Sequence, residues 1–239
     1  MYLGRVVFIG LTDQGIPYCA YAISGRSEAS KERILKVDGN TVKTKPLVEE
    51  LTPEQEEKRD LLFYDAIITD SGHKRAVVSN GEQTRHSFYA ANDLIAPGSL
   101  SEIVYGFMKA GGPEPDDYRT PRITGILDVL DILRDYKKPD SALGIVTENG
   151  LTARFIVPER GEACFVSTYE GDSLEKHKIV IPDLVVPIDS IEIGGAKSAE
   201  DLAEWTYDWL EHDFRVGTAA AVWLPYENRF DLAVRNLHD

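Results

Sequence analysis

The sequence predicts an α+β fold in which antiparallel β-sheets carry helices on their outer faces. Runs rich in β-branched and aromatic residues recur in neighbouring pairs, and short turn sequences join most of these pairs. Two longer segments show helical periodicity behind capping residues instead. They separate groups of strands rather than alternating with single strands. The resulting order of strands, helix, strands, helix, strands disfavours a doubly wound parallel fold.

Three hairpins are expected in the first half of the chain. Asp, Asn, Gly and Ser fill the connections within the pairs, and these residues favour turns because they accept positive φ or bond to their own backbone. The expected pairs are residues 3–11 with 18–24, residues 33–38 with 41–45, and residues 66–69 with 75–79. Asn80 and Gly81 end the third pair.

Capping residues predict where three helices begin. Residues 52–55 read Thr-Pro-Glu-Gln, which places a capping Thr before Pro at the first helical position of a short exposed helix. Residues 99–102 form a capping box, and apolar side chains follow at helical spacing until the glycines at residues 111–112. Ser198 begins a third helix whose apolar residues share one face. The two longer helices should each cover a sheet.

Five further strands are expected in the second half. Residues 143–147, 151–157 and 163–169 predict a three-strand meander, and their apolar runs suggest burial on both faces. Residues 218–224 and 230–234 predict a closing hairpin.

Composition and charge exclude several classes of function. The 239 residues carry 26 Lys and Arg against 40 Asp and Glu, a formal net charge of −14. This charge opposes binding to nucleic acid or to an anionic membrane, since both attract exposed cationic clusters. The apolar runs are far shorter than the roughly 18 residues of a membrane span, and no export signal is evident. We expect a cytoplasmic protein that folds as one domain over residues 1–239.

The sequence contains no pattern typical of a metal or cofactor site. Cys19 and Cys164 lie far apart, and neither they nor the five histidines show ligand spacing. The dinucleotide fingerprint, the Walker loop, the nucleophile elbow and the HExxH motif are also missing from the sequence. We therefore expect no metal and no cofactor.

Three segments combine residue types that suit a ligand-binding or catalytic site. Residues 25–33 place three cations and several hydroxyls directly after a strand. Residues 79–84 supply amide, hydroxyl and carboxyl groups beside a glycine. Residues 114–122 combine acids and arginines in a proline-stiffened loop that suits proton transfer and phosphate binding. Mixed-charge surface loops have the same composition, so the residues alone leave both interpretations open.

Several sequence blocks, in one order along nearly the whole chain, resemble the archaeal-type IMP cyclohydrolase family. They are Tyr-Leu-Gly-Arg at residues 2–5, Gly-Arg-Ser at 25–27, Tyr-Asp-Ala-Ile at 64–67, Ala-Val-Val-Ser-Asn-Gly at 76–81, Thr-Pro-Arg-Ile at 120–123 and Ser-Thr-Tyr-Glu at 167–170. The resemblance implies a four-layer α/β/β/α sandwich similar to N-terminal-nucleophile hydrolases. It also implies cyclodehydration of 5-formamidoimidazole-4-carboxamide ribotide to IMP in purine biosynthesis.

The same resemblance assigns site residues. The implied catalytic residues are Tyr64, Glu114, Asp117 and Arg122. Tyr64 would donate its hydroxyl, either Glu114 or Asp117 would move protons, and Arg122 would brace the base or the developing oxyanion. The implied substrate-binding residues are Arg26, Ser27, Lys31, Arg33, Asn80, Gly81, Gln83, Arg119 and Thr120. Among them the three cations near residue 30 would meet the anionic ribotide, and Asn80 and Gln83 would orient the carboxamide.

Departures from the family pattern keep other functions open. Lys31 and Glu32 stand in a loop that is often richer in Arg and Asn, and Arg85 replaces an acid. A non-catalytic purine-nucleotide-binding or regulatory protein, or a cyclohydrolase for a related amide, would also fit. Residues 126–138 look longer than the equivalent connection in compact members, so they are expected to cover the site or join subunits. The expected partners are a small purine ribotide and further copies of the chain.

Overall fold

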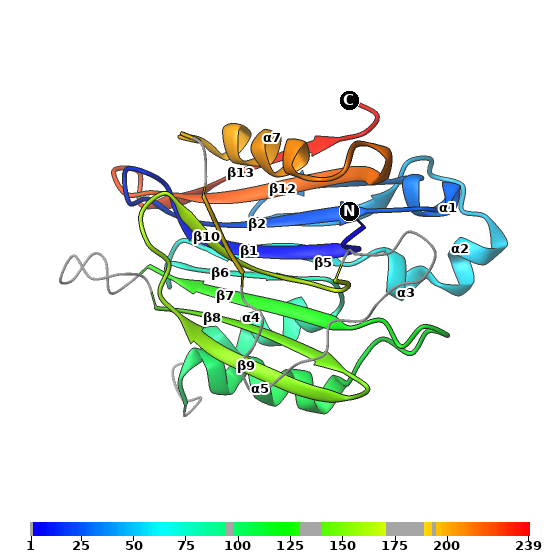
Figure 1. Cartoon of the computed structure of the whole chain (residues 1–239), viewed down its shortest axis with the longest axis horizontal. Coiled ribbons are helices and arrows are strands. Elements are labelled where there is room, and N and C mark those ends of the chain that lie inside the picture. Colours follow the sequence, from blue (N-terminus) through cyan, green and yellow to red (C-terminus); the bar gives the residue numbers. More distant parts are fainter. Residues whose placement is uncertain (1, 94–97, 130–139, 171–188, 193–194) are drawn as a thin grey trace.

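Two antiparallel sheets lie face to face in the computed structural model, with helices on their outer faces (Figure 1). The structure describes residues 2–93, 98–129, 140–170, 189–192 and 195–239. Helix α7 (Ala199–Trp209) covers one sheet, and helices α4 (Gln83–Asn92) and α5 (Leu100–Gly111) cover the other. The predicted α+β class and its antiparallel sheets are confirmed.

Six of the described strands form the sheet under α7, in the order β11-β10-β1-β2-β12-β13. Their bounds are β1 (Arg5–Leu11), β2 (Pro17–Ser24), β10 (Glu162–Ser167), β11 (Asp189–Glu192), β12 (Arg215–Leu224) and β13 (Arg229–Asn236). Phe8 of β1 lies opposite Ala20 of β2 and Phe165 of β10. The pairing of β1 with β2 and of β12 with β13 confirms the expected first and last hairpins.

The second sheet follows chain order, β3-β4-β5-β6-β7-β8-β9, among the described residues. Its strands are β3 (Arg33–Asp38), β4 (Thr41–Pro46), β5 (Asp65–Asp70), β6 (Arg75–Ser79), β7 (Arg122–Asp128), β8 (Asp140–Thr147) and β9 (Gly150–Ile156). The hairpins β3–β4 and β5–β6 are confirmed. Strand β7 was not predicted, and it includes the first residues of the 126–138 segment. Residues 130–138 of that segment lie outside the described residues.

The predicted three-strand meander is wrong at its third strand. β8 pairs with β9, but β10 pairs with β1 and β11 in the opposite sheet. Near Gly161, at φ +76°, the chain crosses between the sheets, and the amide of Gly161 donates to the carbonyl of Leu11. β9 is an edge strand, with Phe155 52% exposed, rather than a strand buried on both faces. Local pattern predicts a strand but does not specify which sheet receives it.

Capping residues set the predicted helix starts. Helix α2 (Pro53–Glu57) begins after Thr52, whose hydroxyl and amide form reciprocal hydrogen bonds with Gln55. Both α5 and α7 begin with complete capping boxes, from Ser99 and Ser198. Helix α4 was not predicted. Nor were the short helices α1 (Glu28–Lys31), α3 (Arg59–Leu62) and η1 (His212–Phe214).

Alternating side chains of the central strands point into two different apolar layers. Val7 and Ile9 of β1 point between the sheets, whereas Val6 and Phe8 point toward α7. A third layer packs α4 and α5 on the other sheet through residues such as Val104. This arrangement explains why the run from residue 6 to residue 9 is apolar without alternation. No helix in the described part of the chain is long and apolar enough to cross a membrane.

Candidate active site

Polar side chains meet between the sheets at one end of the sandwich. Arg5 opens β1 and Arg122 opens β7, while Tyr64 directly precedes β5 and Asn80 directly follows β6. Because neighbouring strands run antiparallel, the starts of some strands and the ends of others share one edge. The N-terminus and the helices α1, α2 and α3 lie at this same end, on the right of Figure 1. We call Arg5, Tyr64, Asn80 and Arg122, together with the side chains that contact them, the end site.

A buried ion pair occupies the end site. The Nη2 atom of Arg5 lies 2.5 Å from Oε1 of Glu114, and the two side chains are 15% and 4% exposed. Burial alone would lower the pKa of Arg5, but Glu114, Tyr64 and Tyr21 outweigh it and raise that pKa well above its usual value. The guanidinium therefore stays charged. Burial raises the pKa of Glu114, although Arg5 opposes the shift.

These contacts leave one oxygen of Glu114 available. Asn80 Nδ2 also donates to Oε1, at 3.2 Å, whereas Oε2 makes no hydrogen bond to a described residue. A carboxyl group with a raised pKa, held through one oxygen and open at the other, has the arrangement that proton transfer requires.

Both polar atoms of the Asn80 side-chain amide are hydrogen-bonded within the protein. Nδ2 donates to the carbonyl of Pro121 at 2.8 Å, and Oδ1 accepts from the amide of Ile123 at 2.8 Å and from Gln83 Nε2 at 3.1 Å. It ties the end of β6 to the start of β7 and fixes Gln83. Gly81 is the next residue. A Cβ there would lie 2.5 Å from Gln83 Oε1, so a larger residue at this position would displace the Gln83 side chain.

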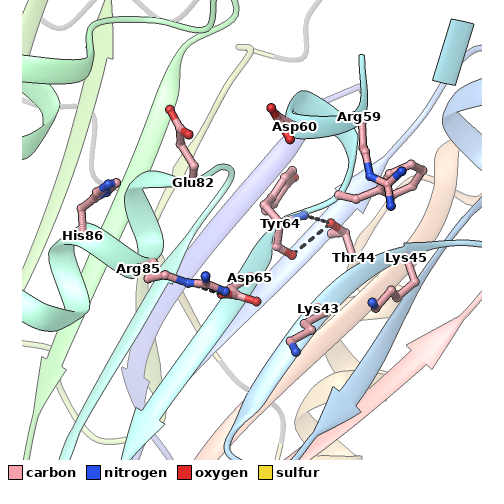
Figure 2. A pocket seen from close by; sticks show the side chains of 11 residues that line it. Lys43, Thr44, Lys45, Arg59, Asp60, Tyr64, Asp65, Glu82, Arg85 and His86 are labelled. Atoms are coloured by element: carbon pink, nitrogen blue, oxygen red, sulfur yellow. Dashed lines mark hydrogen bonds and ion pairs between the residues drawn. The ribbon is translucent and has the colours of Figure 1, made fainter. Parts of the chain in front are cut away.

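Tyr64 is anchored at both its backbone and its hydroxyl. Its amide donates to Thr44 Oγ1 at 2.7 Å, and that hydroxyl donates to the carbonyl of Tyr64 at 3.1 Å (Figure 2). Its Oη lies 2.6 Å from Oη of Tyr21. Arg5 interacts electrostatically with both tyrosines. Tyr64 therefore belongs to the same buried cluster as Glu114.

Three buried polar atoms at the end site have no partner among the described residues. They are Nε of Arg5, Nε of Arg122 and Oε1 of Gln83. Arg122 is otherwise held by the carbonyl of Gly111 at 3.4 Å and by Glu82 at 3.7 Å. Buried polar groups are normally hydrogen-bonded, so two spare donors and one spare acceptor suit a ligand that offers both a carbonyl and an N–H.

The loop after Glu114 separates the two candidate acids. Asp117 is exposed, whereas Glu114 is buried. Arg119 is also exposed, at φ +48°. Thr120 is buried and receives support from Asp116, whose carboxylate accepts from its amide at 2.8 Å and its hydroxyl at 2.6 Å. The structure thus brings Glu114 and Thr120 to the end site and leaves Asp117 and Arg119 on the surface.

The cations near residue 30 also differ in placement. The Arg26 guanidinium lies 4.8 Å from the ring centroid of Tyr2, which stacks on Tyr169 at 5.6 Å. Arg33 is 3% exposed, and its Nε donates to the carbonyl of Ser30 at 3.2 Å. Tyr169 reaches the end site through its hydroxyl, 3.4 Å from Oγ1 of Thr120, and Arg33 interacts electrostatically with Tyr21. Both arginines therefore lie toward the end site.

Ser27 and Lys31 serve the turn that carries these arginines. The Ser27 hydroxyl accepts from the amide of Ser30 at 3.1 Å, and Ser27 is exposed. Lys31 ends α1, and its carbonyl lies 3.1 Å from Nε2 of His238. No described contact joins either side chain to the buried cluster.

Sequence reasoning missed three residues of the cluster: Arg5, Tyr21 and Tyr169. Arg5 and Tyr169 stood within the resemblance blocks without a role. A signal for Arg5 was present, because a cation at the start of an apolar strand contradicts the strand's own pattern. Gly4 before it has φ +73°, and a Cβ there would lie 2.2 Å from Thr168 Oγ1. Tyr21 looked like any core aromatic and carried no such signal.

A cavity of about 450 Å³ opens beside Tyr64. Figure 2 shows Lys43 and Lys45 of β4 on one side and Arg85 of α4 on the other. Four Lys and Arg side chains line it against three carboxylates. Arg85 is paired with Asp65 at 2.5 Å. Lys43 and Arg59 are paired as well, with Asp38 at 2.6 Å and with Glu56 at 3.0 Å, so the lining carries little unbalanced positive charge.

The described residues contain no group of three His, Cys, Asp or Glu side chains arranged to hold a metal ion.

Comparison with known proteins gives the family. A family model described as IMP cyclohydrolase-like protein matches residues 2–224. A protein of Methanococcus maripaludis strain C7, described as IMP cyclohydrolase, is 29% identical over 228 residues, covering 94% of this chain and 96% of its own. The corresponding proteins of Methanocaldococcus jannaschii and Haloarcula marismortui are 28% and 29% identical, and cover 93% and 99% of this chain and 94% and 99% of their own. The chain belongs to the IMP cyclohydrolase-like protein family.

Proposed function

We propose that this member of the family is an IMP cyclohydrolase, which closes 5-formamidoimidazole-4-carboxamide ribotide to IMP with loss of water. Full-length relatives described as IMP cyclohydrolase support the activity. The observation that carries the proposal is the end site itself. There a buried carboxyl with a raised pKa lies among spare donors and a spare acceptor that complement an amide.

The reaction needs two proton movements and no external nucleophile. The carboxamide nitrogen bonds to the formyl carbon and gives up one proton, while the formyl oxygen gains a proton and becomes a hydroxyl. The carbon–oxygen bond then breaks, the formamide nitrogen loses its proton as the carbon–nitrogen double bond forms, and the oxygen leaves as water with a second proton. Holding the two substituents in contact supplies much of the acceleration.

Glu114 and Tyr64 are the proposed proton carriers. Oε2 of Glu114 takes the proton of the attacking nitrogen while Tyr64 gives its proton to the formyl oxygen. In the second step Glu114 returns its proton to the departing oxygen, and Tyr64 recovers one from the formamide nitrogen. Both groups therefore end as they began.

The spare polar atoms hold the reacting amide. Oε1 of Gln83 accepts an N–H of the carboxamide, and Nε of Arg5 or Arg122 donates to an oxygen that gains negative charge. Asn80 acts by fixing Gln83 and Glu114. Gly81 and Thr120 are proposed to line the end site beside the reacting amide.

We assign the anionic ribotide to Arg26 and Arg33, which lie toward the end site, with Lys31 and Arg119 as outer cations and Ser27 as support for the turn. Ser27, Lys31 and Arg119 lack a described contact to the cluster, so their roles stay predictions. Of the two candidate acids, the exposed Asp117 is assigned no step. Similarity to N-terminal-nucleophile hydrolases, assembly of several copies and a cytoplasmic location also remain proposals.

The test compares Glu114→Gln with Asp117→Asn in an ultraviolet assay of IMP formation, with a chelator present to test metal independence. We expect Glu114→Gln to lower kcat about 100-fold or more, because it cannot carry the proton. Asp117→Asn, its matched control on the exposed part of the loop, should keep wild-type activity. Thermal unfolding checks that both variants fold.

Other outcomes identify the alternatives. Wild-type protein that forms no IMP, but whose melting temperature rises with the ribotide, would be a nucleotide-binding protein on this fold. Activity with a related amide but not with the ribotide would assign a different substrate. A large loss in Asp117→Asn alone would place the proton carrier at the exposed acid.

A further inference from the structure

Tyr21 shares a hydrogen bond with Tyr64 that packing does not require. Tyr21 lies in β2, is fully buried between the sheets, and its Oη is 2.6 Å from Oη of Tyr64. Tyr18, in the same strand, points to the opposite face and is equally buried, yet its hydroxyl has no hydrogen-bond partner among the described residues. This fold therefore tolerates a buried tyrosine without a bonded hydroxyl. The pairing at Tyr21 calls for a separate explanation.

The direction of this hydrogen bond follows from the surroundings. Burial and the neighbouring Tyr64 raise the pKa of Tyr21 well above its usual value, so Tyr21 stays protonated. Tyr64 Oη is the only described partner of the Tyr21 hydroxyl. Tyr64 lines the cavity of about 450 Å³, whereas Tyr21 is not among its lining residues, so a bound molecule would meet the pair from the side of Tyr64. With Tyr21 as donor, the hydrogen of Tyr64 turns away from Tyr21 toward a bound molecule.

Two arginines interact with the pair, one of them the Arg5 that is itself paired with Glu114. Arg5 interacts with both tyrosines, and Arg33 interacts with Tyr21. A hydrogen bond to the oxygen of a phenol, reinforced by cations in a buried site, stabilises negative charge on that oxygen. That is the charge which Tyr64 acquires when its proton leaves.

We propose that Tyr21 is a positioning residue that, with Arg5, makes the hydroxyl of Tyr64 the proton donor of the reaction. The inference rests on the proposed cyclohydrolase function. As the O–H bond of Tyr64 breaks and an O–H bond to the formyl oxygen forms, Tyr21 donates to the resulting phenolate. The formamide proton restores Tyr64 when water leaves. Tyr21 itself neither touches substrate nor exchanges a proton.

The experiment measures kcat and KM for Tyr21→Phe and for its matched control Tyr18→Phe. Tyr21→Phe should lower kcat about tenfold and leave KM unchanged, because the lost hydrogen bond is stronger to the developing phenolate than to the neutral phenol of the bound state. Tyr18→Phe removes a hydroxyl of the same strand that has no partner in the described part of the chain, and should leave both constants unchanged. Equal losses in the two variants would reduce the effect to packing and overturn the inference.

A double-mutant cycle then tests whether Tyr21 acts through Tyr64. Single-turnover rates are measured at high enzyme concentration for Tyr64→Phe and for Tyr21→Phe/Tyr64→Phe. If the inference holds, the second substitution costs nothing once the Tyr64 hydroxyl is gone. Additive losses would contradict it. So would Tyr64→Phe with wild-type activity.

The wild-type assay and the Tyr21→Phe variant together separate this inference from the proposed function. Wild-type protein that makes no IMP refutes the function. Wild-type turnover with an unaffected Tyr21→Phe variant refutes only the role of Tyr21.

Discussion

Burial distinguishes two carboxylates that lie three residues apart in one loop. Glu114 and Asp117 have the same chemistry and were equally good candidates for moving a proton. In the folded chain Glu114 turns inward to Arg5 and Asn80, and Asp117 stays in solvent. Desolvation raises the pKa of Glu114 above its usual value.

The pH dependence of kcat/KM should report this shift. Glu114 must be ionised to accept a proton, and a raised pKa means that it protonates sooner on acidification. Arg5 and Arg122 lower that pKa, and Asp116 adds to the rise. We expect the acid limb of a profile between pH 4 and 8 to lie above the ordinary glutamate value of about 4.3. An acid limb at or below the ordinary glutamate value would contradict the assignment to Glu114. Asp117→Asn should leave the pH of this limb unchanged.

At the scale of elements, capping determines where the covering helices begin. The Ser198 hydroxyl accepts from the amide of Asp201 at 3.0 Å, and the Asp201 carboxylate accepts from the amide of Ser198 at 3.1 Å. Helix α7 thereby starts where Leu202 and Trp209 can reach the sheet. Local chemistry and burial agree at this point.

Ser198→Ala should lower the free energy of unfolding by about 1 kcal/mol, the usual cost of an N-cap. Denaturant unfolding measures the change. Glu200→Ala, an exposed substitution in the first turn of the same helix, is the matched control. It should cost only about 0.3 kcal/mol, from the lost charge near the helix dipole. Equal losses would show that the cap contributes nothing specific.

At the scale of the whole molecule, one side chain joins the two sheets at their edges. Asn236 of β13 accepts from the amide of Leu35 at 2.7 Å and donates to its carbonyl at 3.2 Å, although Leu35 belongs to β3 in the other sheet. Both residues are buried. The backbone of an edge strand is thus satisfied across the interface between the layers.

Asn236→Ala should therefore lower the free energy of unfolding by about 2 kcal/mol or more, because a buried donor and acceptor of Leu35 are left without partners. Asn149→Ala is the control, since Asn149 is exposed and its side chain bonds no described residue. It should change stability by less than about 0.5 kcal/mol. Chemical denaturation of both variants makes the comparison, and similar values would deny Asn236 this role.

The sequence carried enough information for most hairpins and for the capped helices, because turn residues and caps act over three or four positions. It was insufficient for α4, whose buried face consists of Gln83, Thr84, Ser87 and Ala91 and so lacks an apolar period. It was also insufficient for β7. Gly125 interrupts that strand's pattern, and a Cβ there would lie 2.9 Å from Ile9 of the opposite sheet.

Periodicity, caps and motif order are local properties, so the amino-acid order alone was enough for the fold class, the family blocks and the residue types of the candidate site. The folded chain was needed to show which sheet receives β10, which of two acids is buried, and that Arg5 and Tyr21 lie in the buried cluster. Those choices depend on contacts between residues far apart in the chain. The ion pair of Arg5 with Glu114 spans 109 positions, and desolvation at that contact gives the carboxyl its chemistry.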